Sequence, residues 1–203
     1  CDGGAWQDQS GAGLFAEPGS LISNCWIYDN RAESNGGGIY SKGAVSCCTI
    51  MSNRAQYGAG QYGGSADICR IQYNTAEKRG GGAADSTVSG SFLGENIAID
   101  GAAASGGSLV SCTAIWNNAS GAGGAFYKSS VFDGTVHSNT ALYGGGLSGC
   151  TGGGCDIAFN QGWEQGGGVY DSAISNCTVR RNTSDCGGGA SESMLSDCIV
   201  MDN

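Results

Sequence analysis

The chain has 203 residues, of which 39 are Gly and one is Pro, and its formal net charge is −9. This composition excludes collagen, which needs Gly at every third position together with abundant Pro, and typical disordered chains, which combine few apolar residues with a high charge density. Helical domains are disfavoured as well, because each Gly inside a helix costs roughly 1 kcal/mol relative to Ala. The remaining class is a β-rich fold in which Gly has a fixed geometric role.

The negative net charge and the cysteine pattern limit which partners and cofactors the protein can have. Lys and Arg adjoin one another only as Lys78-Arg79 and Arg180-Arg181, so we expect no nucleic acid partner. No apolar run approaches the roughly 18 residues of a membrane-spanning helix, so we expect no direct membrane insertion in this segment. There are 11 Cys but no Cys-x-x-Cys pair, and the single His is His137, which argues against a zinc site. We therefore predict no metal and no cofactor.

The first residues differ from the rest of the chain. Residues 1–10 do not follow the pattern described below, and we expect them to be an atypical N-terminal segment of a single domain that spans 1–203. The sequence begins at Cys1 rather than Met and shows no signal peptide. We interpret it as a mature or cleaved product, or as part of a longer chain or assembly.

After this segment, one pattern recurs nine times in chain order, at intervals of 21–23 residues. Each copy reads apolar, x, x, small, x, aliphatic, x, x, Asn, x, small, and a Gly cluster follows. The Asn residues are Asn30, Asn53, Asn74, Asn96, Asn117, Asn139, Asn160, Asn182 and Asn203. Five positions before each Asn lies a column of small residues, in which Ser91 and Gly134 stand beside seven cysteines: Cys25, Cys48, Cys69, Cys112, Cys155, Cys177 and Cys198.

A repeat of this length with locally alternating apolar residues predicts a parallel β-helix with three short strands per rung. Nine rungs at about 4.8 Å each would form a rod on the order of 40 Å long. A leucine-rich repeat shares the period but needs a Leu scaffold that is missing here. Because parallel β connections are nearly always right-handed, the predicted fold class is all-β, a right-handed parallel β-helix (β-solenoid) of about nine rungs.

The recurring positions have separate physical roles in such a rung. The Asn residues are expected to stack in a turn and to bond through their amides to neighbouring rungs and to the turn backbone, which we call the Asn ladder. The Gly clusters are expected at a corner that needs positive φ or a close approach of backbones. The aliphatic residues supply most of the burial, at about 1.5–3 kcal/mol for each fully buried side chain.

Two interpretations of the Cys column remain open. Adjacent rungs place Cα atoms about 4.8 Å apart, within the roughly 4.4–6.8 Å range of disulfides, so Cys25–Cys48, Cys155–Cys177 or Cys177–Cys198 could pair. The alternative is a stack of reduced, buried thiols that behave as small hydrophobes, which the Ser and Gly in the same column favour. Off the column, the candidates for disulfides or intermolecular bonds are Cys1, Cys47, Cys150 and Cys186.

An outward column of aromatic residues is predicted after the Gly corner, interrupted by Ala84, Ser105, Ser148 and Ser191. Aromatic rows can stack on sugar rings, and they can equally be ordinary pairs that stabilise neighbouring strands. A carbohydrate-binding module that uses this column is therefore one alternative function. The aromatic column consists of Phe15, Tyr40, Tyr62, Tyr127 (or its neighbour Phe126) and Tyr170.

An enzyme that cleaves polysaccharides, a lyase or a hydrolase, is the other alternative. That chemistry needs paired carboxylates, or carboxylates with calcium and a base, on one face. The 18 acidic residues are scattered over the repeat, and His137 has no evident nucleophile as a partner. The rungs also lack the long loops that form substrate clefts. We therefore expect no catalytic residues.

Two motifs recur once per rung, Gly-Gly-small-aliphatic and apolar-x-x-Asn. Examples are 36–39 with 50–53, and 166–169 with 179–182. Over nearly the whole chain these motifs resemble the repeats of chlamydial polymorphic outer membrane proteins, and they are similar to the wider class of bacterial and archaeal surface proteins with right-handed β-helix repeats. Gly at the third motif position, Ile or Val in place of Phe, and the Cys column depart from that pattern. The resemblance implies a surface-exposed, non-enzymatic passenger or structural rod.

We thus predict an extracellular or cell-surface protein, a structural or adhesive β-helix that forms a rod or a subunit of a fibre, sheath or other surface assembly. Rods with open ends tend to stack, because end rungs leave backbone groups unpaired. We expect self-association, end to end or laterally, and a host or matrix glycan or protein as the other class of partner.

Overall fold

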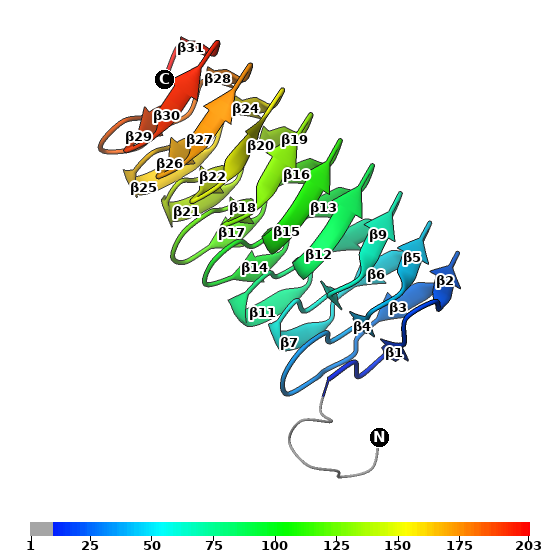
Figure 1. The fold of residues 1–203 in the computed structure, drawn as a ribbon. Helices are drawn as coiled ribbons and strands as arrows, with labels where there is room; N and C mark the ends of the chain where they lie inside the picture. The colour runs from blue at the N-terminus through cyan, green and yellow to red at the C-terminus, as the bar shows by residue number, and fades with distance from the viewer. Residues whose placement is uncertain (1–9) are drawn as a thin grey trace.

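The strands run parallel and stack in register from rung to rung in the computed structural model, which describes residues 10–203 (Figure 1). The blue strands β1–β3 and the red strands β29–β31 lie at opposite ends of the resulting rod. No helix occurs in the described residues, and so none that is long and apolar enough to cross a membrane. The predicted all-β solenoid of about nine rungs is confirmed, while its right-handed sense stays a prediction.

Sheet A contains 16 strands, because most rungs break their strand there into two short pieces. Three short strands per rung were expected, and this break gives four strands to the four rungs β4–β7, β8–β11, β18–β21 and β22–β25. One row of sheet A comprises β1 (Leu14–Ala16), β4 (Ile39–Ser41), β8 (Gln61–Tyr62), β12 (Ala83–Ser89), β15 (Ala104–Val110), β18 (Phe126–Tyr127), β22 (Leu147–Ser148), β26 (Val169–Tyr170) and β29 (Ala190–Ser191). The other row shares β12 and β15 and adds β2 (Leu21–Ser23), β5 (Ala44–Ser46), β9 (Ser65–Asp67), β19 (Ser130–Phe132), β23 (Thr151–Gly153), β27 (Ala173–Ser175) and β30 (Met194–Ser196).

The remaining strands belong to sheets B and C. Sheet B has one strand in every rung: β3 (Trp26–Tyr28), β6 (Thr49–Met51), β10 (Arg70–Gln72), β13 (Phe92–Gly94), β16 (Thr113–Ile115), β20 (Thr135–His137), β24 (Asp156–Ala158), β28 (Thr178–Arg180) and β31 (Ile199–Met201). Sheet C has six: β7 (Arg54–Tyr57), β11 (Thr75–Arg79), β14 (Ile97–Ala98), β17 (Asn118–Ala119), β21 (Thr140–Tyr143) and β25 (Gln161–Gln165).

The core consists of the side chains that alternate inward along these strands. Along sheet B, Ile50, Ile71 and Leu93 lie in register and are fully buried. Large and small residues compensate one another between rungs, since Phe126 stacks on Ala104 in sheet A. A second cluster is made of alanines alone, so this part of the interior is narrow: Ala32, Ala55, Ala59, Ala76, Ala98, Ala102, Ala119 and Ala141.

The Asn ladder joins every rung to the next, and Asn117 shows its bonds. Its Nδ2 donates to the Leu93 carbonyl and to Oδ1 of Asn139, and its backbone N–H donates to that same Oδ1, each at 2.9 Å. Its own Oδ1 accepts the backbone N–H and the Nδ2 of Asn96, both at 3.0 Å. Amide bonds of this kind link successive asparagines from Asn30 to Asn203, and the seven between these two are buried.

At the corners of each rung, residues adopt backbone conformations in the left-handed region, with positive φ. Gly144 has φ of +61°, and at the adjacent Gly145 a Cβ would lie 2.4 Å from the Gln161 carbonyl oxygen, so both reasons for Gly at this corner apply. The residue before every Asn of the ladder and before every member of the Cys column is also left-handed, and most of these residues are not Gly. Trp116, with φ of +57°, is one of them. Because such a conformation costs an L-residue about 1–2 kcal/mol, the stacked hydrogen bonds must hold it in place.

We predict that Asn117→Ala destabilises the protein by about 3 kcal/mol, because it leaves several buried backbone groups without partners. Urea unfolding of the variant and of the wild type measures this difference. Asn30→Ala, at the partly exposed start of the ladder, is the matched control and should cost much less. Equal losses in the two variants would contradict a stabilising role for the buried ladder.

Gln61 is a buried polar residue inside sheet A, and we predict that Gln61→Met raises stability by about 1 kcal/mol. Its Oε1 is the only buried side-chain N or O atom in residues 10–203 without a hydrogen-bond partner. Its Nε2 donates to the Gly63 carbonyl, which also accepts from Ser86 Oγ and so stays bonded in the variant. Removing an unpaired buried acceptor at nearly constant volume is favourable. A lower urea midpoint for the variant would contradict this.

Candidate functional site

The aromatic column is continuous only over the first three rungs. Phe15 stacks on Tyr40 with ring centroids 5.1 Å apart, and Tyr40 stacks on Tyr62 at 5.5 Å. The other two members stand apart from this stack: Tyr127 lies beneath the Lys128 ammonium, and Tyr170 contacts Tyr143 of sheet C at 5.4 Å. The structure therefore places a stack of three rings at one end of the column and single tyrosines further along.

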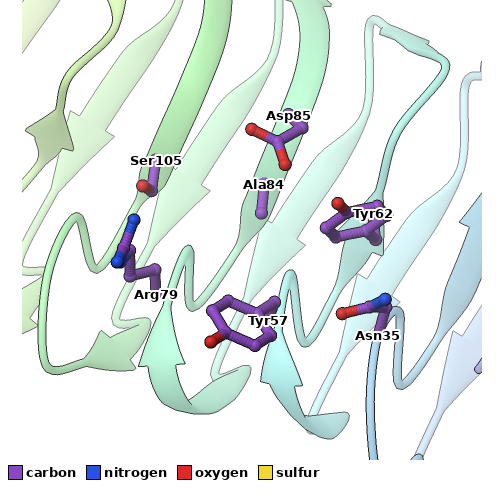
Figure 2. A pocket seen from close by; sticks show the side chains of 7 residues that line it. All are labelled: Asn35, Tyr57, Tyr62, Arg79, Ala84, Asp85 and Ser105. Atoms are coloured by element: carbon purple, nitrogen blue, oxygen red, sulfur yellow. The ribbon is translucent and has the colours of Figure 1, made fainter.

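A groove opens where the stack ends (Figure 2). In the rungs after Tyr62, the in-register positions are Ala84 and Ser105, which have small, buried side chains in place of an aromatic ring. The groove encloses about 180 Å³. Its lining residues are Asn35, Tyr57, Tyr62, Arg79, Ala84, Asp85 and Ser105.

Two columns of residues on either side of the Gly corner form the walls of this groove. Before the corner, Asn35, Tyr57 and Arg79 lie in register on successive rungs. After the corner come Tyr62 and Ala84 of sheet A. Because Gly58 and Gly80 turn the chain sharply between these columns, side chains from both can face the same space.

The groove carries charged groups of both signs. Asp85 is exposed in a left-handed corner with φ of +50°. Arg79 is half exposed and lies 4.0 Å from Asp100, outside the groove, so its charge is already shared. Partial burial and the nearby Asp85 carboxylate raise the pKa of Tyr62 to about 12, which keeps its hydroxyl neutral as a hydrogen-bond donor.

The ten cysteines of residues 10–203 are free. In the Cys column, successive rungs are joined through sulfur: the backbone N–H of Cys25 donates to Cys48 Sγ, and that of Cys155 to Cys177 Sγ, both at 3.4 Å. Five of the seven thiols are buried, and the two end members, Cys25 and Cys198, are partly exposed. The structure thus contains the reduced stack rather than the cross-rung disulfides.

The cysteines off the column differ from one another. The prediction that Cys150 is a disulfide candidate is wrong in this structure: its side chain is buried, and its backbone N–H donates to Ser172 Oγ at 2.9 Å. It belongs to a second inner column of small residues, in which Ser129 and Ser172 occupy the adjacent rungs, and burial raises its pKa to about 11. Cys47 and Cys186 are exposed, and Cys1 lies outside the described residues.

The surroundings of His137 and of the carboxylates are the other features of the structure that bear on catalysis. His137 Nδ1 lies 3.0 Å from Ser138 Oγ, and its ring packs against Phe159 at 4.7 Å. Within residues 10–203, no three His, Cys, Asp or Glu side chains are grouped so that they could hold a metal ion. The only carboxylate that lines the groove is that of Asp85.

Sequence reasoning missed most of the groove. It noted Ala84 and Ser105 as interruptions, but it did not connect them with Tyr57, Arg79 or Asp85. The available signal was the succession of two small residues in an otherwise aromatic column, which marks an unfilled place on a regular surface. It also missed a corner column with exposed aromatic side chains at every second rung: Tyr73, Trp116 and Phe159.

Comparisons of the chain with protein-family models, with curated proteins and with solved structures find no match. No relative therefore assigns a role to the groove, the thiols or the ends of the rod.

We predict that Cys47 and Cys186 react quickly with iodoacetamide in the native protein, whereas the buried thiols react only after unfolding. Burial restricts access, and it also raises the pKa of Cys69 to about 11, which lowers the thiolate fraction at a given pH. Peptide mass spectrometry of the alkylated protein measures each site. A peptide linked by a disulfide between Cys155 and Cys177, or equal labelling of exposed and buried sites, would contradict the reduced stack.

Proposed function

We propose that this chain is a non-enzymatic rod segment of an extracellular or cell-surface structure, in which it serves as a structural or adhesive element. The observation that carries the proposal is the unchanged bonding of each rung to the next, from Asn30 to Asn203. A further rung, supplied by the same chain or by a second copy, can be added with the same bonds.

The last described rung shows what such an addition would cover. Val200 of β31 is 52 % exposed, while Val179, its in-register partner in β28, is fully buried. Ile199 is 59 % exposed beside it. Stacking a rung here would bury the Val200 side chain and pair the edge of β31.

The surface of the rod supports a non-enzymatic role. Cleavage of a glycosidic bond uses two carboxyl groups that flank the bond, roughly 5–10 Å apart. The groove contributes one carboxylate, Asp85, and its basic residue Arg79 is shared with Asp100. Binding without catalysis fits this set of groups better than a hydrolase or lyase does.

The finer identity rests on the sequence motifs. The Gly-Gly-small-aliphatic and apolar-x-x-Asn motifs resemble the repeats of chlamydial polymorphic outer membrane proteins and related surface proteins. That resemblance supports a location at the cell surface. The net charge of −9 is consistent with a soluble, exposed rod.

The proposal predicts that the purified chain associates end to end in a concentration-dependent manner. Val200→Lys should prevent this, because the ammonium group would be buried against the next rung without a partner. Sedimentation velocity should show species larger than the 20.3 kDa monomer for the wild type and a monomer for the variant. Electron microscopy should show linear particles.

Thr113→Lys provides the matched control, since it adds the same charge on the partly exposed outer face of sheet B in a central rung. It should associate like the wild type. Circular dichroism establishes that both variants keep their β structure. A wild type that stays monomeric at all concentrations, or a Val200→Lys variant that associates equally well, would contradict the proposal.

A further inference from the structure

We propose that the groove beside Tyr62 is a binding site for one neutral pyranose ring of a glycan. The site extends the proposed adhesive role, but it does not depend on association of the rods. Of the predicted aromatic column the site uses only Tyr62, together with Ala84 and Ser105, at which that column is interrupted.

The first element of the site is the ring of Tyr62, at the end of the aromatic stack. Tyr62 is the last ring of the stack, and one of its faces is covered by Tyr40 at 5.5 Å. The next in-register residue is Ala84, whose methyl group cannot cover the other face. The Tyr62 side chain is partly exposed, and a partly exposed ring at the end of a stack can serve as a platform for the C–H face of a sugar, with its position fixed before binding.

The second element is a set of polar groups around that platform. Figure 2 shows Asp85 above Ala84, Tyr62 with Asn35 beneath it on the right, and Ser105 with Arg79 beneath it on the left, while Tyr57 lies between Arg79 and Asn35. Carboxylate and amide oxygens accept hydrogen bonds, while the guanidinium and amide N–H groups donate them. Pyranose hydroxyls do both, so a ring on Tyr62 would meet complementary partners at its edge.

The charges select a neutral sugar over an anionic ligand. A uronate or a phosphate would face the Asp85 carboxylate, and the one cation that lines the groove, Arg79, lies 4.0 Å from Asp100. The chain as a whole carries −9. Repulsion therefore opposes anionic ligands, whereas neutral hydroxyls can bond to both Asp85 and Arg79.

The size of the groove limits the ligand to about one ring. Its volume is about 180 Å³, below the roughly 300–1,000 Å³ of pockets that enclose drug-sized ligands. A small, open site of this kind binds weakly, with a dissociation constant on the order of 1 mM for a single sugar. Repetition along an assembled rod would increase the avidity for a polymer.

The test is a titration of the full chain, followed by NMR, with methyl β-glucoside, methyl β-galactoside, methyl α-mannoside and methyl N-acetyl-β-glucosaminide, and with methyl β-glucuronide as the anionic comparison. At least one neutral glycoside should shift the backbone amide signals of Tyr62, Ala84 and Ser105. The glucuronide should bind more weakly than its neutral counterpart.

Two variants should weaken binding, each raising the dissociation constant about tenfold or more. Tyr62→Ala deletes the platform. Ala84→Tyr fills the groove with the residue that the same column holds in the two preceding rungs, so the variant is expected to fold and to extend the stack. Tyr170→Ala, in the same column but outside the groove, is the matched control and should bind like the wild type.

The proposal is overturned if no neutral glycoside shifts these signals, if Ala84→Tyr binds as well as the wild type, or if Tyr170→Ala loses as much affinity as Tyr62→Ala. Preference for the glucuronide would overturn the assignment to neutral sugars. Because all the residues of the groove belong to one chain, failure of this test leaves the association experiment unaffected, and failure of association leaves sugar binding testable.

Discussion

The hydrogen bonds of the buried Asn ladder are the interaction on which the rest of the rod depends. A carboxamide offers two donors and one acceptor on a short side chain, and in Asn117 all of these are used within the chain and toward both neighbouring rungs. Asp would lack the donors. Because each ladder residue bonds to its equivalent in the next rung, the register of the three sheets cannot slip without breaking buried bonds.

The hydrogen bonds that fix this register offset the conformational energy of the strained corners. Left-handed conformations at Trp116 and Phe159 are unfavourable for bulky L-residues, yet they recur at the same point of the rung as Ser52 and Ser138. The backbone is held there by its stacked neighbours, so the corner accepts almost any side chain that points to solvent. The outer surface can therefore vary from rung to rung while the interior keeps its small and aliphatic columns.

A surface of this kind can form a site without an inserted loop. Replacing the aromatic residue at one position by Ala84 leaves a recess, and its walls are the residues that the neighbouring rungs already present. The thiols of the inner columns, by contrast, are part of the interior. Cys112 and Cys150 are buried in narrow columns in which Ser or Gly occupies the same position in other rungs. The small size of the thiol therefore matters more there than its reactivity. The function that we propose places specificity on the outside of the rod and stability on the inside.

The sequence by itself determined the rung, its length and its interior columns, because residues one period apart must be axial neighbours in a parallel solenoid. The Asn ladder, the aliphatic columns and the Gly corner follow from that period. Cys150 was misjudged because the pattern was anchored on one small-residue column, and the second column, with Ser129 and Ser172, became visible only in the structure. The tertiary structure alone decided which columns face one another across a corner, as Tyr57 and Arg79 do with Tyr62. The physical reason is that the repeat places equivalent residues of successive rungs next to one another along the axis, so the sequence reveals these neighbours. Neighbours across a corner depend on where the left-handed turns lie. Non-Gly residues such as Asp85 adopt this conformation too, and the sequence gives no signal for it.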